Sequence, residues 1–95
     1  SLKPQGAVQV DSGALDALIA GKSLLPAGVT AISGDFARGE LVRILAEDGR
    51  DLGCGLVGFD SAEAQQILGC RTTEIEERLG YASRGAIIHR DDMVL

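Results

Sequence analysis

The amino-acid sequence predicts a mostly β fold with short helices, of the α+β class. Glycine supplies 13 of the 95 residues, which favours tight turns and close backbone packing over a helical bundle. Five short segments have the pattern of strands, and three have the spacing of helices. Aromatic residues make up only 3% of the chain, so its single core has to be built from Leu, Ile, Val and Ala.

The first third of the chain predicts strand, helix and strand. Apolar side chains alternate over residues 7–10, which indicates a strand. Residues 11–13 supply an N-cap, and apolar residues at helical spacing over 14–19 predict a helix that Gly21 ends. Residues 29–33 form the next predicted strand, while Pro26 excludes the preceding apolar residues from the centre of a sheet.

The middle of the chain predicts a hairpin. Residues 40–46 alternate as a strand, and Asp48-Gly49 is a signal for a type I′ turn. The returning strand, residues 51–59, contains Gly53, Gly55 and Gly58. Glycines this dense weaken a strand, so we expect them at a bend, a bulge or a close backbone contact.

The last third predicts two helices and a strand. Asp60 with Glu63 forms a capping-box pair, and Thr73 with Glu76 repeats that signature. The final strand is predicted at residues 86–89. Together the elements suggest a compact β pseudo-barrel with helical decoration. Its predicted core consists of Val8, Leu15, Leu18, Ile32, Val42, Ile44, Leu56, Ile67 and Ile87, with Phe36 as a further anchor.

Several motifs have a simpler structural interpretation. Residues 53–58 fit the dinucleotide pattern G-x-G-x-x-G, but no βαβ unit surrounds them, so we interpret these glycines as serving a bent strand. His89 is the only histidine, and a zinc site would lack ligands. We expect His89 to end the last strand, and residues 90–92 to form a local polar cluster.

Charge and cysteine content narrow the function classes. The net charge of −5 disfavours nucleic-acid binding, which gains most of its affinity from Lys and Arg on phosphates. Cys54 and Cys70 have neither a CxxC nor a metal spacing, which is typical of reduced thiols in the cytoplasm. No apolar run approaches the length of a membrane span.

Three blocks of sequence occur in a recognisable order. They are Ser23-Leu-Leu-Pro26, Phe36-x-Arg38-Gly39 and His89-Arg-Asp-Asp92. In this order and spacing the chain resembles the C-terminal PUA domain of bacterial glutamate 5-kinase, from about Gly6 to Leu95. The resemblance implies a PUA-type pseudo-barrel over residues 6–95. Residues 1–5 are expected to be a linker end or cloning remnant.

The resemblance also implies a parent enzyme. Glutamate 5-kinases transfer the γ-phosphate of ATP, with Mg²⁺, to the side-chain carboxylate of L-glutamate in the first step of proline biosynthesis. The amino-acid-kinase domain that binds ATP and Mg²⁺ would precede this chain. For the chain itself we expect no catalytic, cofactor-binding or metal-binding residue. We expect a regulatory or assembly role, with its own kinase domain as partner and a homo-oligomer through the parent.

A second function fits the same resemblance. In PUA domains the loop between the first helix and the second strand contributes to RNA contact, and the matching positions are 21–29. An RNA-binding module would need cations and exposed amides there. The candidate residues for an RNA or interdomain contact are Gly21, Lys22, Ser23, Gly28, Arg38, Arg43 and Arg50.

Overall fold

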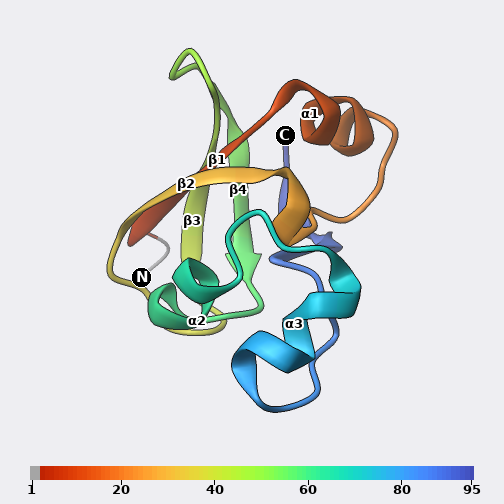
Figure 1. Ribbon diagram of the computed structural model, residues 1–95. Coiled ribbons are helices and arrows are strands. Elements are labelled where there is room, and N and C mark those ends of the chain that lie inside the picture. The colour runs from red at the N-terminus through yellow and green to blue at the C-terminus, as the bar shows by residue number, and fades with distance from the viewer. Residues whose placement is uncertain (1–2) are drawn as a thin grey trace.

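The computed structural model describes residues 3–95, so the first two residues of the predicted remnant lie outside the described part. Five strands, three α-helices and a 3₁₀ turn at Pro26–Gly28 follow along these residues (Figure 1). The strands are β1 (Gly6–Val10), β2 (Val29–Gly34), β3 (Leu41–Ala46), β4 (Asp51–Val57) and β5 (Ile88–Val94). The helices are α1 (Ser12–Ile19), α2 (Ser61–Gln66) and α3 (Thr72–Leu79). The mostly β, α+β prediction is confirmed.

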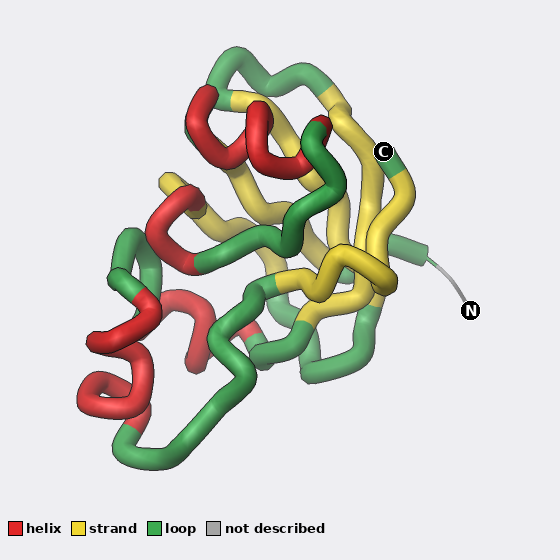
Figure 2. Tube along the Cα trace, turned by 90° about the vertical axis from the view of Figure 1, so that its right-hand side faces the viewer, coloured by secondary structure: helices red, strands yellow, loops and turns green. Residues whose placement is uncertain are grey.

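One mixed sheet organises the molecule. Its strand order is β2-β1-β3-β4-β5, in which β1 and β3 are parallel and the other pairs antiparallel. The helices gather on one side of the strands in Figure 2. Leu24, which precedes β2, forms a β-bridge with Ile88 in β5, the opposite edge strand. This bridge draws the two edges of the sheet toward each other around the core, as a pseudo-barrel requires.

The core is aliphatic, as the sequence indicates. Val42 and Ile44 face inward from β3, and Phe36 anchors the end of the sheet. Six of the nine predicted core residues are buried, and Leu15 and Ile32 are half-buried. The prediction for Leu56 was wrong, because this side chain is 37% exposed. Its strand neighbours Gly55 and Val57 are buried, so the pleat directs Leu56 outward.

The β3–β4 hairpin differs from its predicted turn type. A type I′ turn needs positive φ at both central residues. In the loop at residues 47–50 only Gly49 has positive φ (89°), and Asp48 does not. The Gly49 amide donates to Ala46 O at 2.9 Å, and Ala46 N donates to Arg50 O at 2.9 Å. The connection is therefore a longer loop with one left-handed glycine, accompanied by a register shift at Ile44/Leu45.

Two further boundaries differ from the predictions. Helix α3 begins two residues earlier than the Thr73–Glu76 signature predicts: Arg71 is the N-cap, and the Glu74 carboxylate accepts its amide at 3.0 Å. The predicted last strand was too early and too short, because β5 continues through the charged residues to Val94. An edge strand tolerates those charges because its outward side chains face solvent.

The capping box of α2 and the glycine interpretation are confirmed. Asp60 accepts the Glu63 amide at 2.7 Å, and Glu63 accepts the Asp60 amide at 2.9 Å. At Gly55, a Cβ would meet Ile88 Cγ2 at 2.6 Å and Asp92 O at 3.0 Å. The glycines of β4 thus let the backbone of β5 approach closely, and the pairing of these two strands is irregular at this point.

Candidate functional site

The loop between α1 and β2 borders an apolar groove. A hollow of about 400 Å³ lies between α1 and this loop. It is lined by Ala14, Ala17, Lys22, Ser23, Leu24, Leu25, Ala27 and Gly28. Three of the candidate contact residues, Lys22, Ser23 and Gly28, therefore share one surface.

Backbone hydrogen bonds hold this loop in place. Leu24 is buried and pairs with the start of β5 and the residue before it: its amide donates to Ile88 O at 2.9 Å, and its carbonyl accepts from Ile87 N at 2.8 Å. The Ser23 hydroxyl accepts the Arg90 amide at 2.9 Å. Ser23 is thus engaged in joining the loop to β5. The groove rim is formed by a loop with a fixed backbone.

The surface beside the groove is hydrophobic. Leu25, which lines the groove, is 46% exposed, and Ala14, Ala17 and Ala27 line it as well. Lys22 is the one cation that lines the groove among residues 3–95. Exposed aliphatic side chains around a shallow apolar groove are typical of protein contacts rather than phosphate contacts.

The three candidate arginines are each paired with an acid. Arg38 binds Glu63, and Arg43 binds Asp51 across the β3–β4 hairpin. Arg50 binds Asp48 at 2.9 Å in the hairpin loop. They lie on three different parts of the fold and do not line the groove of Lys22.

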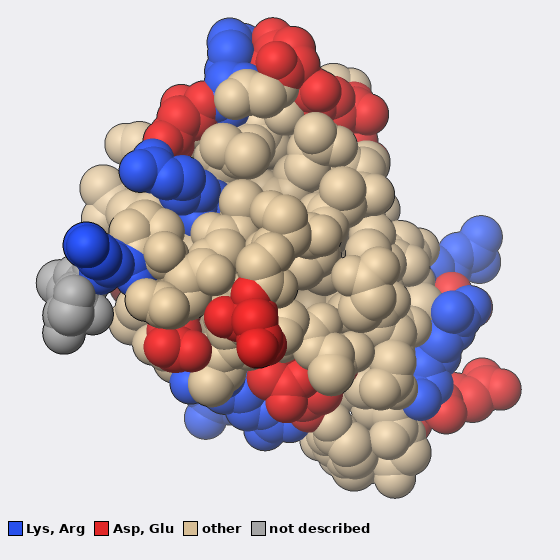
Figure 3. Space-filling view, turned by 90° about the vertical axis from the view of Figure 1, so that its left-hand side faces the viewer, with Lys and Arg blue, Asp and Glu red and all other residues tan. Residues whose placement is uncertain are grey.

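The charged side chains on one face are mixed in sign. In Figure 3, Lys and Arg lie around the rim, Asp and Glu lie between them and also in the lower middle of the face, and uncharged residues cover most of the rest. The cations visible there do not merge into one continuous patch. A mixed rim of this kind gives a weak net field for attracting phosphates.

A polar cluster at the opposite end of the fold connects three elements. Glu63, which is only 9% exposed, receives Arg38 Nε at 2.9 Å and a second bond from the Arg38 guanidinium. The Tyr81 hydroxyl donates to the same carboxylate. The Arg38 guanidinium also lies 5.9 Å from the centroid of the Tyr81 ring, within range of a cation–π contact.

The cluster changes the pKa values of its members. The pKa of Glu63 is lowered from 4.5 to about 2, first by the hydrogen bond from Arg38 and then by those of Tyr81 and the Asp60 amide, against the opposing effect of burial. The Glu63 carboxylate raises the pKa of Tyr81 above its ordinary value, and it raises that of Arg38 as well. The sequence indicates Glu63 only as a capping residue, because Arg38 and Tyr81 are 25 and 18 positions away along the chain.

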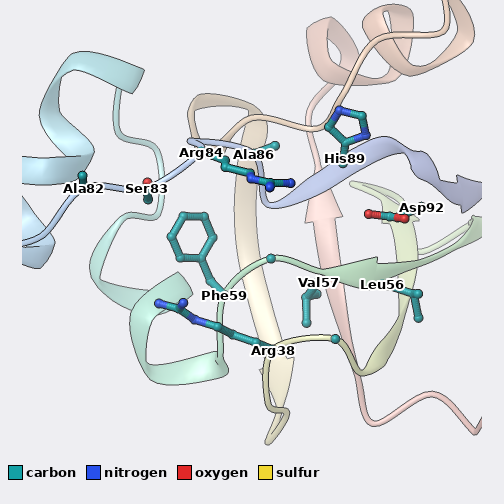
Figure 4. A pocket seen from close by; sticks show the side chains of 12 residues that line it. Arg38, Leu56, Val57, Phe59, Ala82, Ser83, Arg84, Ala86, His89 and Asp92 are labelled. Atoms are coloured by element: carbon teal, nitrogen blue, oxygen red, sulfur yellow. The ribbon is translucent and has the colours of Figure 1, made fainter.

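A larger hollow lies next to this cluster, between β4, β5 and the segment after α3 (Figure 4). Its volume is about 480 Å³. Apolar residues, among them Val57, Phe59 and Ala86, line it together with Arg38, Ser83, Arg84, His89 and Asp92. No pattern in the sequence unites these residues, which come from four separate segments.

Within residues 3–95, no cluster of three or more His, Cys, Asp or Glu side chains is placed to hold a metal ion. Cys54 and Cys70 are free thiols, half-buried and buried. Among the same residues no helix is long and apolar enough to cross a membrane.

Comparison with known proteins identifies relatives of the whole chain. The model of the PUA domain family matches residues 6–79. The chain is 55% identical over 94 residues to glutamate 5-kinase 1 of Mesorhizobium japonicum and 56% identical over 95 residues to glutamate 5-kinase of Dinoroseobacter shibae. These matches cover 99% and 100% of this chain, but 25% and 26% of the relatives. The chain thus spans about a quarter of the length of the curated relatives that it matches.

Two solved structures have a similar fold. A PUA domain from Aeropyrum pernix K1, solved as a tartrate complex, gives a TM-score of 0.67 at 30% identity and covers 90% of this chain and 41% of that one. A conserved PUA domain protein from Thermoplasma acidophilum gives a TM-score of 0.57 at 22% identity, with coverage of 62% and 39%. The second likeness concerns the fold alone.

Proposed function

The chain belongs to the PUA domain family, and we propose that it is the C-terminal, non-catalytic domain of a glutamate 5-kinase. The observation that carries this proposal is the identity of 55–56% along practically the whole chain to enzymes of that name. Residues 6–95 would be the domain, and residues 1–5 the end of a linker. The chain contributes no catalytic group in this proposal, because it matches only about a quarter of the length of the kinases.

The parent enzyme would phosphorylate the side-chain carboxylate of L-glutamate with ATP. ATP and Mg²⁺ would be bound by the kinase portion, for which the relatives' greater length leaves room. The product would be L-glutamyl 5-phosphate, the first intermediate of proline biosynthesis. A biosynthetic kinase of this kind would work in the cytoplasm, where ATP is available.

The domain's own role would be assembly or regulation through contact with the kinase portion. The groove between α1 and the loop at residues 21–28 supports this role. Its rim exposes Leu25, which a protein partner would remove from water at a gain of roughly 25 cal/mol per Å² of apolar surface. Homo-oligomers would form through the parent enzyme.

RNA binding is the second candidate, because two cations adjoin the loop. Lys22 and Arg90 line one shallow hollow with Gly21 and Met93. Two cations are few for a nucleic-acid site, and the net charge of −5 works against them. The arginines at positions 38, 43 and 50 are engaged with acids and add little. We therefore place the kinase-domain contact first.

Phosphotransfer assays on three polypeptides test the proposal. These are the complete polypeptide, a shortened polypeptide that ends just before Gly6 and so lacks this domain, and the 95-residue chain. With ATP, Mg²⁺ and L-glutamate, we expect the first two to form L-glutamyl 5-phosphate and the third to form none. We expect the truncation to change the oligomeric state or the response to an end-product inhibitor. Turnover by the purified 95-residue chain, or none by the complete polypeptide, would overturn the assignment.

A further inference from the structure

The hollow between β4, β5 and the segment after α3 has the properties of a small-molecule site. Its volume of about 480 Å³ lies within the usual range for ligand pockets, about 300–1,000 Å³. Its walls come from the β2–β3 connection, the end of β4, residues 82–86 and β5. Ligand sites typically combine an apolar floor with a few polar groups, and this hollow has both.

The floor is formed by aliphatic and aromatic groups. Val57 and Phe59 are buried, and Leu56 stands at the rim with 37% of its surface exposed. The backbone of the floor is already engaged: Gly58 N donates to Ile87 O and Gly39 N donates to Val57 O, both at 2.8 Å. The floor therefore offers hydrophobic contact, and polar recognition has to come from side chains.

Two side chains of opposite charge stand over this floor without an ion-pair partner. Arg84 and Asp92 take part in no salt bridge among residues 3–95. In contrast, the arginines at positions 38, 43 and 50 are each paired with an acid. In Figure 4 the Arg84 side chain extends toward β5, from which His89 and Asp92 project. Arg38 also lines the hollow, but its guanidinium is already engaged by Glu63.

His89 supplies a further donor. Its Nδ1 accepts the Asp91 amide at 3.2 Å. The Asp91 carboxylate lies 3.5 Å from the same Nδ1. When Nδ1 accepts the Asp91 amide, the proton of the neutral imidazole lies on Nε2, which has no hydrogen-bond partner among the described residues. The hollow thus presents the guanidinium of Arg84 and the Nε2–H of His89 as donors, and the carboxylate of Asp92 as an acceptor.

We propose that this hollow binds a small zwitterionic α-amino acid with an aliphatic side chain. The carboxylate of the ligand would accept hydrogen bonds from Arg84 and from His89 Nε2, since arginine pairs well with planar carboxylates. The ammonium group would donate to Asp92. The aliphatic side chain would lie on Val57 and Phe59. Asp92 argues against a phosphate or a plain anion, because either would be repelled by its charge.

Titration of the 95-residue chain by two-dimensional amide NMR tests the proposal. The ligand series is L-leucine, 4-methylpentanoate, which lacks the ammonium group, and 3-methylbutylamine, which lacks the carboxylate. We expect saturable shifts of the amides of Gly58, Arg84 and His89 with L-leucine at roughly millimolar concentration. We expect weaker binding of both analogues, since each leaves one charged side chain unpaired.

Two variants separate the roles of the charges. Arg84→Gln should weaken both carboxylate ligands by about tenfold, as expected on loss of a charge-assisted hydrogen bond. Asp92→Asn should weaken L-leucine but leave 4-methylpentanoate unchanged or improved. Arg50→Gln, at the hairpin loop and outside the hollow, is the matched control and should bind as the unchanged chain does.

Three outcomes would overturn the proposal. One is the absence of saturable shifts at the hollow with any of the three ligands. Another is binding that Arg84→Gln does not weaken. The third is inorganic phosphate producing the same shifts more tightly than L-leucine, which would make the hollow a plain anion site. None of these outcomes bears on the proposed membership in a kinase, which rests on sequence identity and not on this hollow.

Discussion

Glu63 performs three tasks with one side chain. It completes the capping box of α2, pairs with Arg38 and accepts the Tyr81 hydroxyl. Its carboxylate is nearly buried, so its charge depends on these donors for compensation. A residue recognised in the sequence as a helix cap therefore also joins the β2–β3 connection to the segment after α3.

Titration of Tyr81 measures this cluster directly. The chain has one tyrosine and no tryptophan, so its phenolate absorbance reports Tyr81 alone. We expect a pKa above the ordinary 10.0, because the phenolate would lose its hydrogen bond to Glu63 and meet a second negative charge. In Glu63→Gln the pKa of Tyr81 should fall below its value in the unchanged chain, because the hydrogen bond to the carboxylate and the negative charge of Glu63 are both removed. The same titration in denaturant gives the reference. Equal values in the folded and the denatured chain would contradict the cluster.

Ile44 tests the core at the level of one side chain. It is fully buried at the centre of β3 and faces the aliphatic core. Ile44→Ala should lower the free energy of unfolding by about 2–5 kcal/mol, from lost burial and the cavity that remains. Denaturant melts measure this loss. The control is Ile19→Ala, whose side chain is 71% exposed, and its effect should stay within about 0.5 kcal/mol. A loss below about 1 kcal/mol at Ile44 would remove it from the core.

Strands β4 and β5 depend on the absence of a side chain at Gly55. A Cβ at this position would meet both the Ile88 side chain and the backbone of Asp92. The irregular pairing of the two strands surrounds this point. The G-x-G-x-x-G pattern thus reflects the close approach of two strands.

Replacement of Gly55 by alanine tests this close approach. Gly55→Ala should destabilise the domain by about 1–3 kcal/mol, the usual range for an overpacked interior. Gly13→Ala is the control: in α1 its Cβ would meet only Asp11 Oδ1, at 3.5 Å, so stability should hold or rise slightly. Thermal melts of both variants measure the difference. An unchanged melting temperature for Gly55→Ala would show that the strands separate without cost.

Local sequence patterns predicted where helices and strands form better than they predicted how the strands pair in the sheet. The alternation in β3 and the Asp60–Glu63 cap depend on neighbours within a few residues, and both were predicted correctly. The end of β5 was missed because its charges resemble a loop until the sheet places them at an edge. The hollow beside β5 could not be predicted, because its residues come from four segments that only the folded chain brings together.

The charge distribution of the whole molecule governs its affinity for RNA. The net charge is −5, and the loop at residues 21–28 carries one lysine and no aromatic side chain for base stacking. Each of the arginines at positions 38, 43 and 50 lies beside an acid. Steering of a polyanion toward this surface is therefore weak.

We expect the domain to bind RNA only in the non-specific range. Fluorescence anisotropy with a pool of tRNA at physiological salt should give a Kd of about 10⁻⁴–10⁻⁶ M or weaker. The affinity should fall further with salt, on a shallow slope that reflects few phosphate contacts. Sub-micromolar binding that Lys22→Ala and Arg38→Ala both weaken would contradict this expectation.

The groove beside α1 is proposed to contact the kinase portion of a longer polypeptide. Amide hydrogen exchange, compared between the 95-residue chain and the complete polypeptide, tests this contact most directly. The contact predicts slower exchange in α1 and residues 21–28 of the complete polypeptide, and unchanged exchange in the hairpin loop at residues 47–50, which serves as the internal control. Identical exchange of α1 and residues 21–28 in both polypeptides would contradict the proposed contact.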